Sequence, residues 1–291
     1  MPGCGASSSG RPVRRWVREV TRSTDNEAIE GADLSDSDKQ LRHRLFIVAG
    51  RLVLLALVVG SWEALAWTGL VPAAFIGRPS KFLPLLVEQT LNGKFVLAAV
   101  DTLSATLMAF ALGGILALAT ALALAVYPTL KELIDPFIDA MNALPRVALV
   151  PLFIVWFGLG TLSKVVSGVS LMYFILLYNT LAGAQSVDPD HLQLSRSLGL
   201  SRREVFLRIV IPTAIPSIFV GLRLGLVYTL LGVVTAELIA GGKGLGSLIS
   251  YYSNTFDADG VFAVLLVLIV VAYALSMVMT RIERWLTRWN R

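Results

Sequence analysis

Four polar side chains lie within one otherwise apolar stretch and are the best candidates for binding chemistry. Ionisable groups in such stretches are costly to place in a membrane and therefore mark functional positions. Their spacing of four, three and four residues would place them in one stripe along a helix. The stripe predicts either part of a solute path or gate, in which the guanidinium would attract an anion, or a polar seam packed against another helix. The four are Asp135, Asp139, Asn142 and Arg146.

Two further charges, Arg223 and Glu237, lie in a second apolar stretch. Almost four helical turns separate them, so they share one face about 21 Å apart and cannot pair with each other. Each must meet water, substrate or another helix. We expect path or gate residues here, with an ion pair or an interfacial hydrogen bond as the structural alternative. Gly221 and Gly225 have the spacing that allows close approach of a neighbouring helix.

Residues for catalysis are missing from the sequence. Lys164 follows a serine, and Lys243 lies between glycines without a following Ser or Thr, so neither completes a phosphate-binding loop. The two histidines, His43 and His191, lie in different segments and suggest neither a metal site nor a nucleophile with its base. We therefore expect no enzymatic activity, no metal and no cofactor in this chain.

The composition indicates a membrane protein. Of the 291 residues, 55% are hydrophobic and only 15% are charged, and the mean hydropathy is +0.71, whereas soluble domains carry about 25% charged residues. A soluble enzyme and a secreted domain are excluded. The single cysteine, Cys4, allows no internal disulfide, and the net charge of +5 concerns orientation rather than nucleic acid.

The apolar residues form six blocks long enough to cross a bilayer, which needs about 20 helical residues. The fold class is therefore all-α, a polytopic bundle of about six transmembrane helices, and the third span should be broken by Pro145 and Pro151. Residues 79–94 should form a short helix on the outer surface, and 241–260 an irregular cap. The expected spans are 45–69, 95–126, 135–158, 162–184, 212–240 and 261–280.

The ends of the chain are expected in the cytoplasm. Residues 1–44 have no apolar period and predict a disordered tail; a twin-arginine signal at Arg14 and Arg15 is disfavoured because no apolar core follows. With this orientation the inside segments carry seventeen basic residues and the outside segments five, as the positive-inside rule requires. Trp285 and Trp289 would then lie at the inner interface.

The segment after residue 187 contains the signals of two short helices. Asp188 can cap a helix opened by the following proline, and Gly199 can end it in the left-handed conformation. Ser201 and Glu204 have the spacing of a capping box that opens a second helix, which should run to Pro212 at the start of the fifth span. A simple connection would need about two to eight residues. The segment 187–211 is therefore either a surface that another protein contacts or an amphipathic hairpin on the membrane.

This segment resembles the coupling loop of ABC importer permeases, whose pattern is EAA, three residues, Gly, nine residues, Ile, one residue and Leu-Pro. Here the triplet departs at all three positions, while the glycine fits and the isoleucine falls ten residues after it. The positions of this chain that correspond to the pattern are Gln193, Leu194, Ser195, Gly199, Ile209 and Pro212. Further likeness, to permeases of the nitrate, sulfonate, taurine and bicarbonate type, lies in the stretches 145–152, 156–158, 179–180, 186–189, 221–223 and 236–237.

The resemblance implies the type I ABC importer permease (MetI-like) fold in the plasma (inner) membrane of a bacterium. It implies two ABC ATPase subunits that hydrolyse ATP and receive the coupling loop, an extracytoplasmic substrate-binding protein, and a second permease, as a homodimer or a sister subunit. The expected solute is small and anionic: a sulfonate, taurine, nitrate, bicarbonate or an aromatic carboxylate. The alternative is a stand-alone secondary transporter or channel, which would need an internal repeat or ion-coupling acids deep in the bilayer; no convincing half-to-half similarity is visible.

Overall fold

The computed structural model describes residues 43–69 and 72–286. The predicted disordered tail, with Arg14 and Arg15, and the anchor Trp289 lie outside the described residues, apart from the last two positions of the tail. The chain divides into two compact units, Met1–Ala64 and Leu65–Arg291. Every described element in both is helical.

Five described helices are long and apolar enough to cross a membrane, and a bent pair brings the number to six if it forms one span. This agrees with the six predicted blocks. The long helices are His43–Trp67, α4 (Lys94–Val126), α7 (Thr161–Gln185), the continuous helix Arg202–Ala240 and α12 (Ala258–Leu286). In the first of these, every residue from 43 to 60 is exposed, so this apolar helix needs lipid or protein around it.

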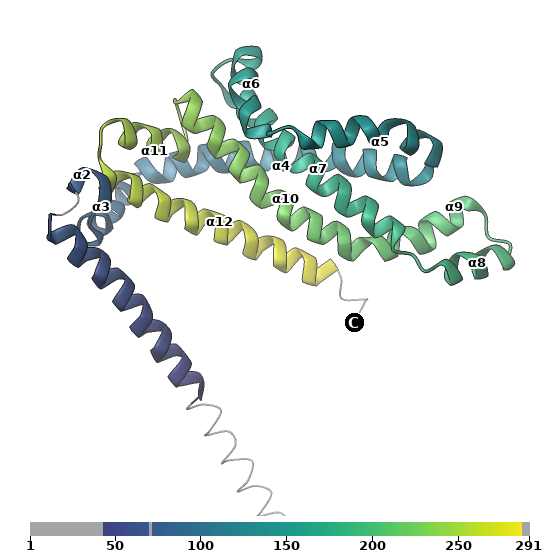
Figure 1. The fold of residues 1–291 in the computed structure, drawn as a ribbon, viewed down its shortest axis with the longest axis horizontal. Helices are drawn as coiled ribbons and strands as arrows, with labels where there is room; N and C mark the ends of the chain where they lie inside the picture. Colours follow the sequence, from purple (N-terminus) through teal and green to yellow (C-terminus); the bar gives the residue numbers. More distant parts are fainter. Residues whose placement is uncertain (1–42, 70–71, 287–291) are drawn as a thin grey trace, which may run out of the picture. The chain divides into compact units, whose positions relative to one another are not determined.

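The core of the larger unit is formed by α4, α7 and α10 (Ile211–Ala240), which pack along one another (Figure 1). Small residues allow this approach. A Cβ on Gly221 of α10 would lie 2.8 Å from the Cβ of Asn179 on α7, and one on Gly225 would lie 3.2 Å from Cε of Met172. The predicted small-xxx-small contact is therefore confirmed, and α7 is its partner.

The third predicted span is a pair of helices rather than one broken rod. α5 (Pro128–Ala143) begins seven residues earlier than predicted, and its partner, η1 (Arg146–Leu149) with α6 (Val150–Phe157), meets it at 81°. Leu144 is extended, as the residue before a proline prefers. Pro145 therefore breaks the segment as predicted. Pro151 does not, because it lies in the first turn of α6, where its missing N–H costs nothing.

Two segments that were predicted on the outer side contain helices that pack within the larger unit. Residues 79–94 contain the predicted short helix, α3 (Pro79–Leu91), preceded by the turn α2 (Ala73–Ile76). Phe82 of α3 is buried and stacks on Phe262 of α12, with ring centroids 5.9 Å apart. The irregular cap predicted for 241–260 is wrong, because it contains α11 (Leu245–Asn254) and the first turn of α12. The glycine and serine residues of this segment gave no helix signal. Contacts with α10 and α4 stabilise α11.

Candidate functional site

The first helix of the 187–211 loop, α8 (Pro189–Ser197), has the predicted ends. The Asp188 carboxylate accepts a hydrogen bond of 2.9 Å from the backbone N–H of Asp190. Gly199 has a φ of +73°, and the N–H of Leu200 donates to the carbonyl of Ser195 at 3.1 Å, the six-to-one bond of a Schellman end. The chain therefore reverses at Gly199.

Replacing Gly199 by alanine should destabilise this turn by about 1 kcal/mol, because a left-handed L-residue is strained. A Cβ at this position meets nothing within 4 Å, so the cost is conformational and not steric. Gly199→Asn should recover most of the loss, since asparagine tolerates this conformation. Hydrogen exchange of the α8 amides would measure the change; equal protection in Gly199→Ala and the parent would contradict it.

The second helix begins as predicted but does not end at Pro212. Ser201 and Glu204 form the capping box: the Ser201 hydroxyl accepts from the Glu204 N–H, and the Glu204 side chain accepts from the Ser201 N–H. α9 (Arg202–Val205) then continues through a wide π-helical turn, η2 (Phe206–Val210), directly into α10. The N–H of Ile211 bonds to the carbonyl of Phe206, five residues earlier. This wider register admits the proline without a break.

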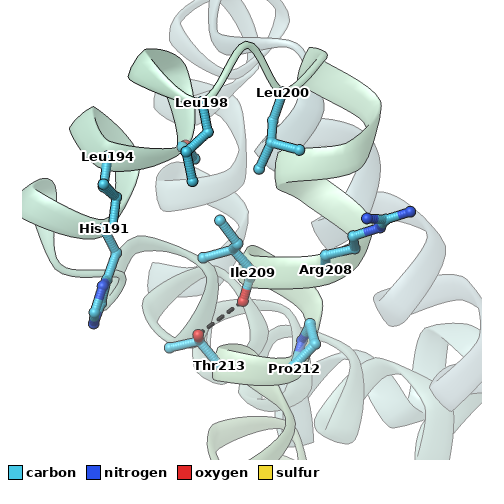
Figure 2. Close-up of a pocket in the computed structure, with 9 residues that line it drawn as sticks. His191, Leu194, Leu198, Leu200, Arg208, Ile209, Pro212 and Thr213 are labelled. Atoms are coloured by element: carbon cyan, nitrogen blue, oxygen red, sulfur yellow. Dashed lines mark hydrogen bonds between the residues drawn. The ribbon is translucent and has the colours of Figure 1, made fainter.

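The two helices enclose an apolar groove of about 310 Å³ at one end of the larger unit (Figure 2). Leu198, Leu200 and Ile209 point toward one another inside it, while Arg208 points away. Leu194 of α8 is 57% exposed, and Leu198, the residue that follows α8, is 70% exposed. We call His191, Leu194 and Leu198, which share one side of α8, the docking face. Exposed leucines beside a polar rim are typical of a protein contact surface.

The triplet Gln193-Leu194-Ser195 is divided between two sides of α8. Gln193 and Leu194 are exposed, whereas Ser195 is buried and its hydroxyl donates to the carbonyl of Leu192 at 2.7 Å. The small third residue is needed because the side chain faces the rest of the protein. Gln193 stands where the family pattern has a glutamate, and its amide side chain carries no charge. It can therefore form hydrogen bonds with a partner but no ion pair.

Three residues of the predicted polar stripe lie on α5, but the whole stripe is not on a single helix. α5 ends at Ala143, and Arg146 lies in the following 3-10 turn. The bend returns the guanidinium to α5: its Nη2 donates to the backbone carbonyl of Asn142 at 3.1 Å and to the side-chain oxygen of the same residue. Its Cζ lies 4.0 Å from the centroid of the Phe174 ring on α7, a cation–π contact.

The two aspartates of the stripe have different partners. Asp139 is exposed and accepts a hydrogen bond of 2.5 Å from the Tyr178 hydroxyl of α7. Asp135, one turn earlier, pairs with Lys131 at 2.5 Å. Within the described residues Arg146 forms no salt bridge, and its buried Nε has no hydrogen-bond partner. The bend therefore holds a cation without a carboxylate partner beside exposed polar groups.

Glu237 forms the centre of a buried clasp at the opposite end of α10. Its carboxylate accepts from Lys164 Nζ of α7 at 3.1 Å, from the Thr102 hydroxyl of α4 at 2.9 Å and from the Gly246 N–H of α11 at 2.9 Å. Glu237 is fully buried and Lys164 is only 8% exposed. The carboxylate thus joins α10 to α4, α7 and α11. Contact with other helices was one of the alternatives predicted for Glu237.

The loop into α11 is shaped around this carboxylate. Lys164 also donates to the carbonyl of Lys243 at 2.6 Å. Gly244 has a φ of +110°, and a Cβ there would overlap the Glu237 carboxylate. Lys164 and Thr102 were not predicted as partners of Glu237. A lysine just inside an apolar block was the available signal, but its partner is 73 residues away.

Arg223 also meets another helix. Its guanidinium pairs with the carboxylate of Glu283 on α12. The predicted charges Arg223 and Glu237 therefore both have partners on other helices of the described part of the chain.

Comparison with known proteins identifies the molecule. Residues 112–291 match the family described as binding-protein-dependent transport system inner membrane component. The chain belongs to this family. It is 29% identical over 246 residues to the taurine transport system permease protein TauC of Escherichia coli, covering 81% of this chain and 88% of the relative. It is 31% identical over 241 residues to the riboflavin transport system permease protein RibX of Chloroflexus aurantiacus, covering 83% and 90%.

The fold has solved counterparts. An inward-facing structure of the MetNI methionine ABC transporter aligns with a TM-score of 0.59 at 16% identity and covers 67% of this chain and 97% of that chain. This confirms the MetI-like fold. The protein is the permease subunit of an ABC importer, a multi-pass membrane protein that works with an ATPase on a separate subunit and with a binding protein. The permease itself is not an enzyme.

Proposed function

We propose that this permease imports a small organic anion along a path beside the α5–α6 bend. One observation carries the proposal: the guanidinium of Arg146 has no carboxylate partner in the described residues, while Asn142 and Asp139 beside it are exposed. Polar groups at membrane depth do not face lipid, so they line a wet cavity or another protein. An anion would supply the charge that Arg146 lacks.

The similarity to relatives supports a sulfonate as the first substrate class to test. TauC carries taurine in its name, and a further relative is a putative aliphatic sulfonates permease of Bacillus subtilis, 28% identical over 240 residues. RibX is named for riboflavin, which is uncharged. Uptake by the complete transporter with taurine, an alkanesulfonate, nitrate, bicarbonate and an aromatic carboxylate, with riboflavin as the uncharged comparison, tests the class; uptake of riboflavin alone would refute it.

Arg146→Gln should weaken the apparent affinity for the anion by about tenfold, since a charge-assisted hydrogen bond contributes about 1.5–3 kcal/mol. Arg146→Lys should retain much of the affinity because it keeps the charge. Arg281→Gln, at the exposed end of α12, is the matched control. Uptake kinetics at constant ATPase activity measure the effect; an unchanged apparent affinity in Arg146→Gln would remove this residue from the path.

We infer that a second permease, a copy of this chain or a sister subunit, completes the path. The side chains of Val220, Leu224 and Leu231 are between 44% and 49% exposed on one face of α10, and spacings of four and seven residues place them on that face. Together with the exposed Asp139, they support a cavity between two subunits. Crosslinking of the assembled transporter through Leu224→Cys, in a Cys4→Ser background, tests whether two identical chains meet there; no self-adduct would favour a sister subunit.

We further infer that both termini and the 187–211 loop are cytoplasmic, on the basis of the basic residues described above. In a Cys4→Ser background, Ser197→Cys in α8 should react with an impermeant thiol reagent only in inverted vesicles. Ser253→Cys in α11 should react only in right-side-out spheroplasts. Both positions are exposed. The reverse pattern would overturn the orientation.

A further inference from the structure

A second cavity, of about 970 Å³, lies between the turn that joins α4 to α5 and the two helices of the loop. Its volume is at the upper end of the range for sites of organic ligands, about 300–1,000 Å³. Its lining contains two arginines and no acidic residue. The lining includes Val126, Tyr127, Leu192, Arg202, Arg203 and Phe206.

The two arginines supply unneutralised charge. Arg202 and Arg203 are exposed, and neither forms a salt bridge to another residue in the part of the chain that the structure describes. The neighbouring carboxylate, Glu204, is occupied: it accepts from the N–H and the hydroxyl of Ser201 at 3.0 and 2.8 Å. Adjacent guanidiniums suit a phosphate, because each can donate two parallel hydrogen bonds.

The remaining wall is apolar and begins where a membrane span ends. Val126 is the last residue of α4, and the side chain of Tyr127 that follows is 61% exposed. Tyrosine at the end of a span is typical of the membrane interface. Phe206 and Val210 extend the apolar surface from the other side of the cavity. A charged end and an apolar wall together match an amphipathic anion rather than a free ion.

The cavity is separate from the docking face. Leu192 lines the cavity, whereas Leu194 lies about 160° and Leu198 about 120° from it around the helical axis, and both leucines are exposed. Ser195 and Leu200 line both the cavity and the groove. A ligand could therefore occupy the cavity while α8 contacts another protein.

We propose that this cavity binds an anionic phospholipid of the cytoplasmic leaflet, with its phosphate on Arg202 and Arg203 and the start of an acyl chain along Phe206 and Val210. Basic pockets between membrane helices on the cytoplasmic side bind such headgroups. The bound lipid would join the α4–α5 turn to the coupling loop. This rests on the proposed cytoplasmic position of that loop.

Native mass spectrometry of the full-length permease in detergent, titrated with phosphatidylglycerol, tests the site. Loss of two interfacial cations in Arg202→Gln/Arg203→Gln should weaken lipid binding by about 30-fold. The matched control is Arg281→Gln/Arg284→Gln, which removes the same charge from the exposed end of α12 and should bind as the parent does. Arg202→Lys/Arg203→Lys should retain most binding.

Equal binding by the first double variant and its control would overturn the proposal. Displacement of the lipid by millimolar inorganic phosphate would also overturn it, in favour of a small-anion site. Phosphatidylcholine should bind weakly to every variant, and tight binding of this zwitterionic lipid would count against a charge-selective site. The lipid titration requires neither a known orientation of the permease in the membrane nor a transported solute. A negative result can therefore be distinguished from failure of the thiol-labelling or uptake experiments.

Discussion

Leu198→Asp, at the residue after α8, should weaken binding of the ATPase to the permease by about 30-fold and reduce ATP-driven uptake to a similar extent. Leu198 lines the groove of Figure 2 and is nevertheless 70% exposed, so the substitution should leave the fold intact. Loss of a hot-spot residue at the centre of a protein contact typically costs 2 kcal/mol or more, which corresponds to about 30-fold in affinity.

The control for this prediction is Leu91→Asp, at the end of α3, where the leucine is 82% exposed and far from the loop. It should bind the ATPase as the parent does. Surface plasmon resonance with the detergent-solubilised permease and its purified ATPase measures both variants. Full binding of Leu198→Asp would show that the docking face is not the contact surface.

Glu237→Gln should destabilise the permease by about 3–5 kcal/mol, because it leaves the Lys164 ammonium buried without a charged partner. The thermal unfolding midpoint should fall by roughly 10 °C. Transport should fall with the amount of folded protein and not through a change in apparent affinity, since the clasp binds helices and not solute. Thermal unfolding in detergent, with uptake normalised to folded protein, measures both quantities.

Two further variants serve as controls for Glu237→Gln. Glu88→Gln alters an exposed glutamate of α3 and should change stability by less than about 0.5 kcal/mol. Lys164→Met combined with Glu237→Gln removes both charges and should recover most of the loss, as replacement of a whole buried pair commonly does. A Glu237→Gln protein as stable as the parent would contradict the role of the clasp.

Local signals allowed much of the fold to be predicted. Apolar blocks located the first helix, α4 and α7 to within two residues, whereas the starts of α5 and of the helix Arg202–Ala240 and the end of α12 differ by six to ten residues. The ends of α8 followed from Asp188 and Gly199, because capping depends only on neighbours in the chain. The continuation of α9 through Pro212 was not predictable from these rules. A π-helical turn changes the hydrogen-bond register, and the sequence has no separate signal for it.

The site was predicted less completely because its contacts cross the chain. Arg146 was recognised as a charge in an apolar stretch, but its contact with Phe174 depends on the 81° bend. Likewise α11 has a glycine-rich beginning, and its hydrogen bonds to Glu237 exist only once α10 is in place. Such elements follow from tertiary structure and not from local propensity.

The contact between the loop and the ATPase can be tested most directly by crosslinking in the assembled transporter. A benzophenone attached through Ser197→Cys of α8, in a Cys4→Ser background, should give an adduct with the ATPase. The same probe at Ser253→Cys of α11 should give none. An ATPase adduct at position 253 and none at 197 would contradict the expectation, taken from the family resemblance, that the ATPase contacts α8.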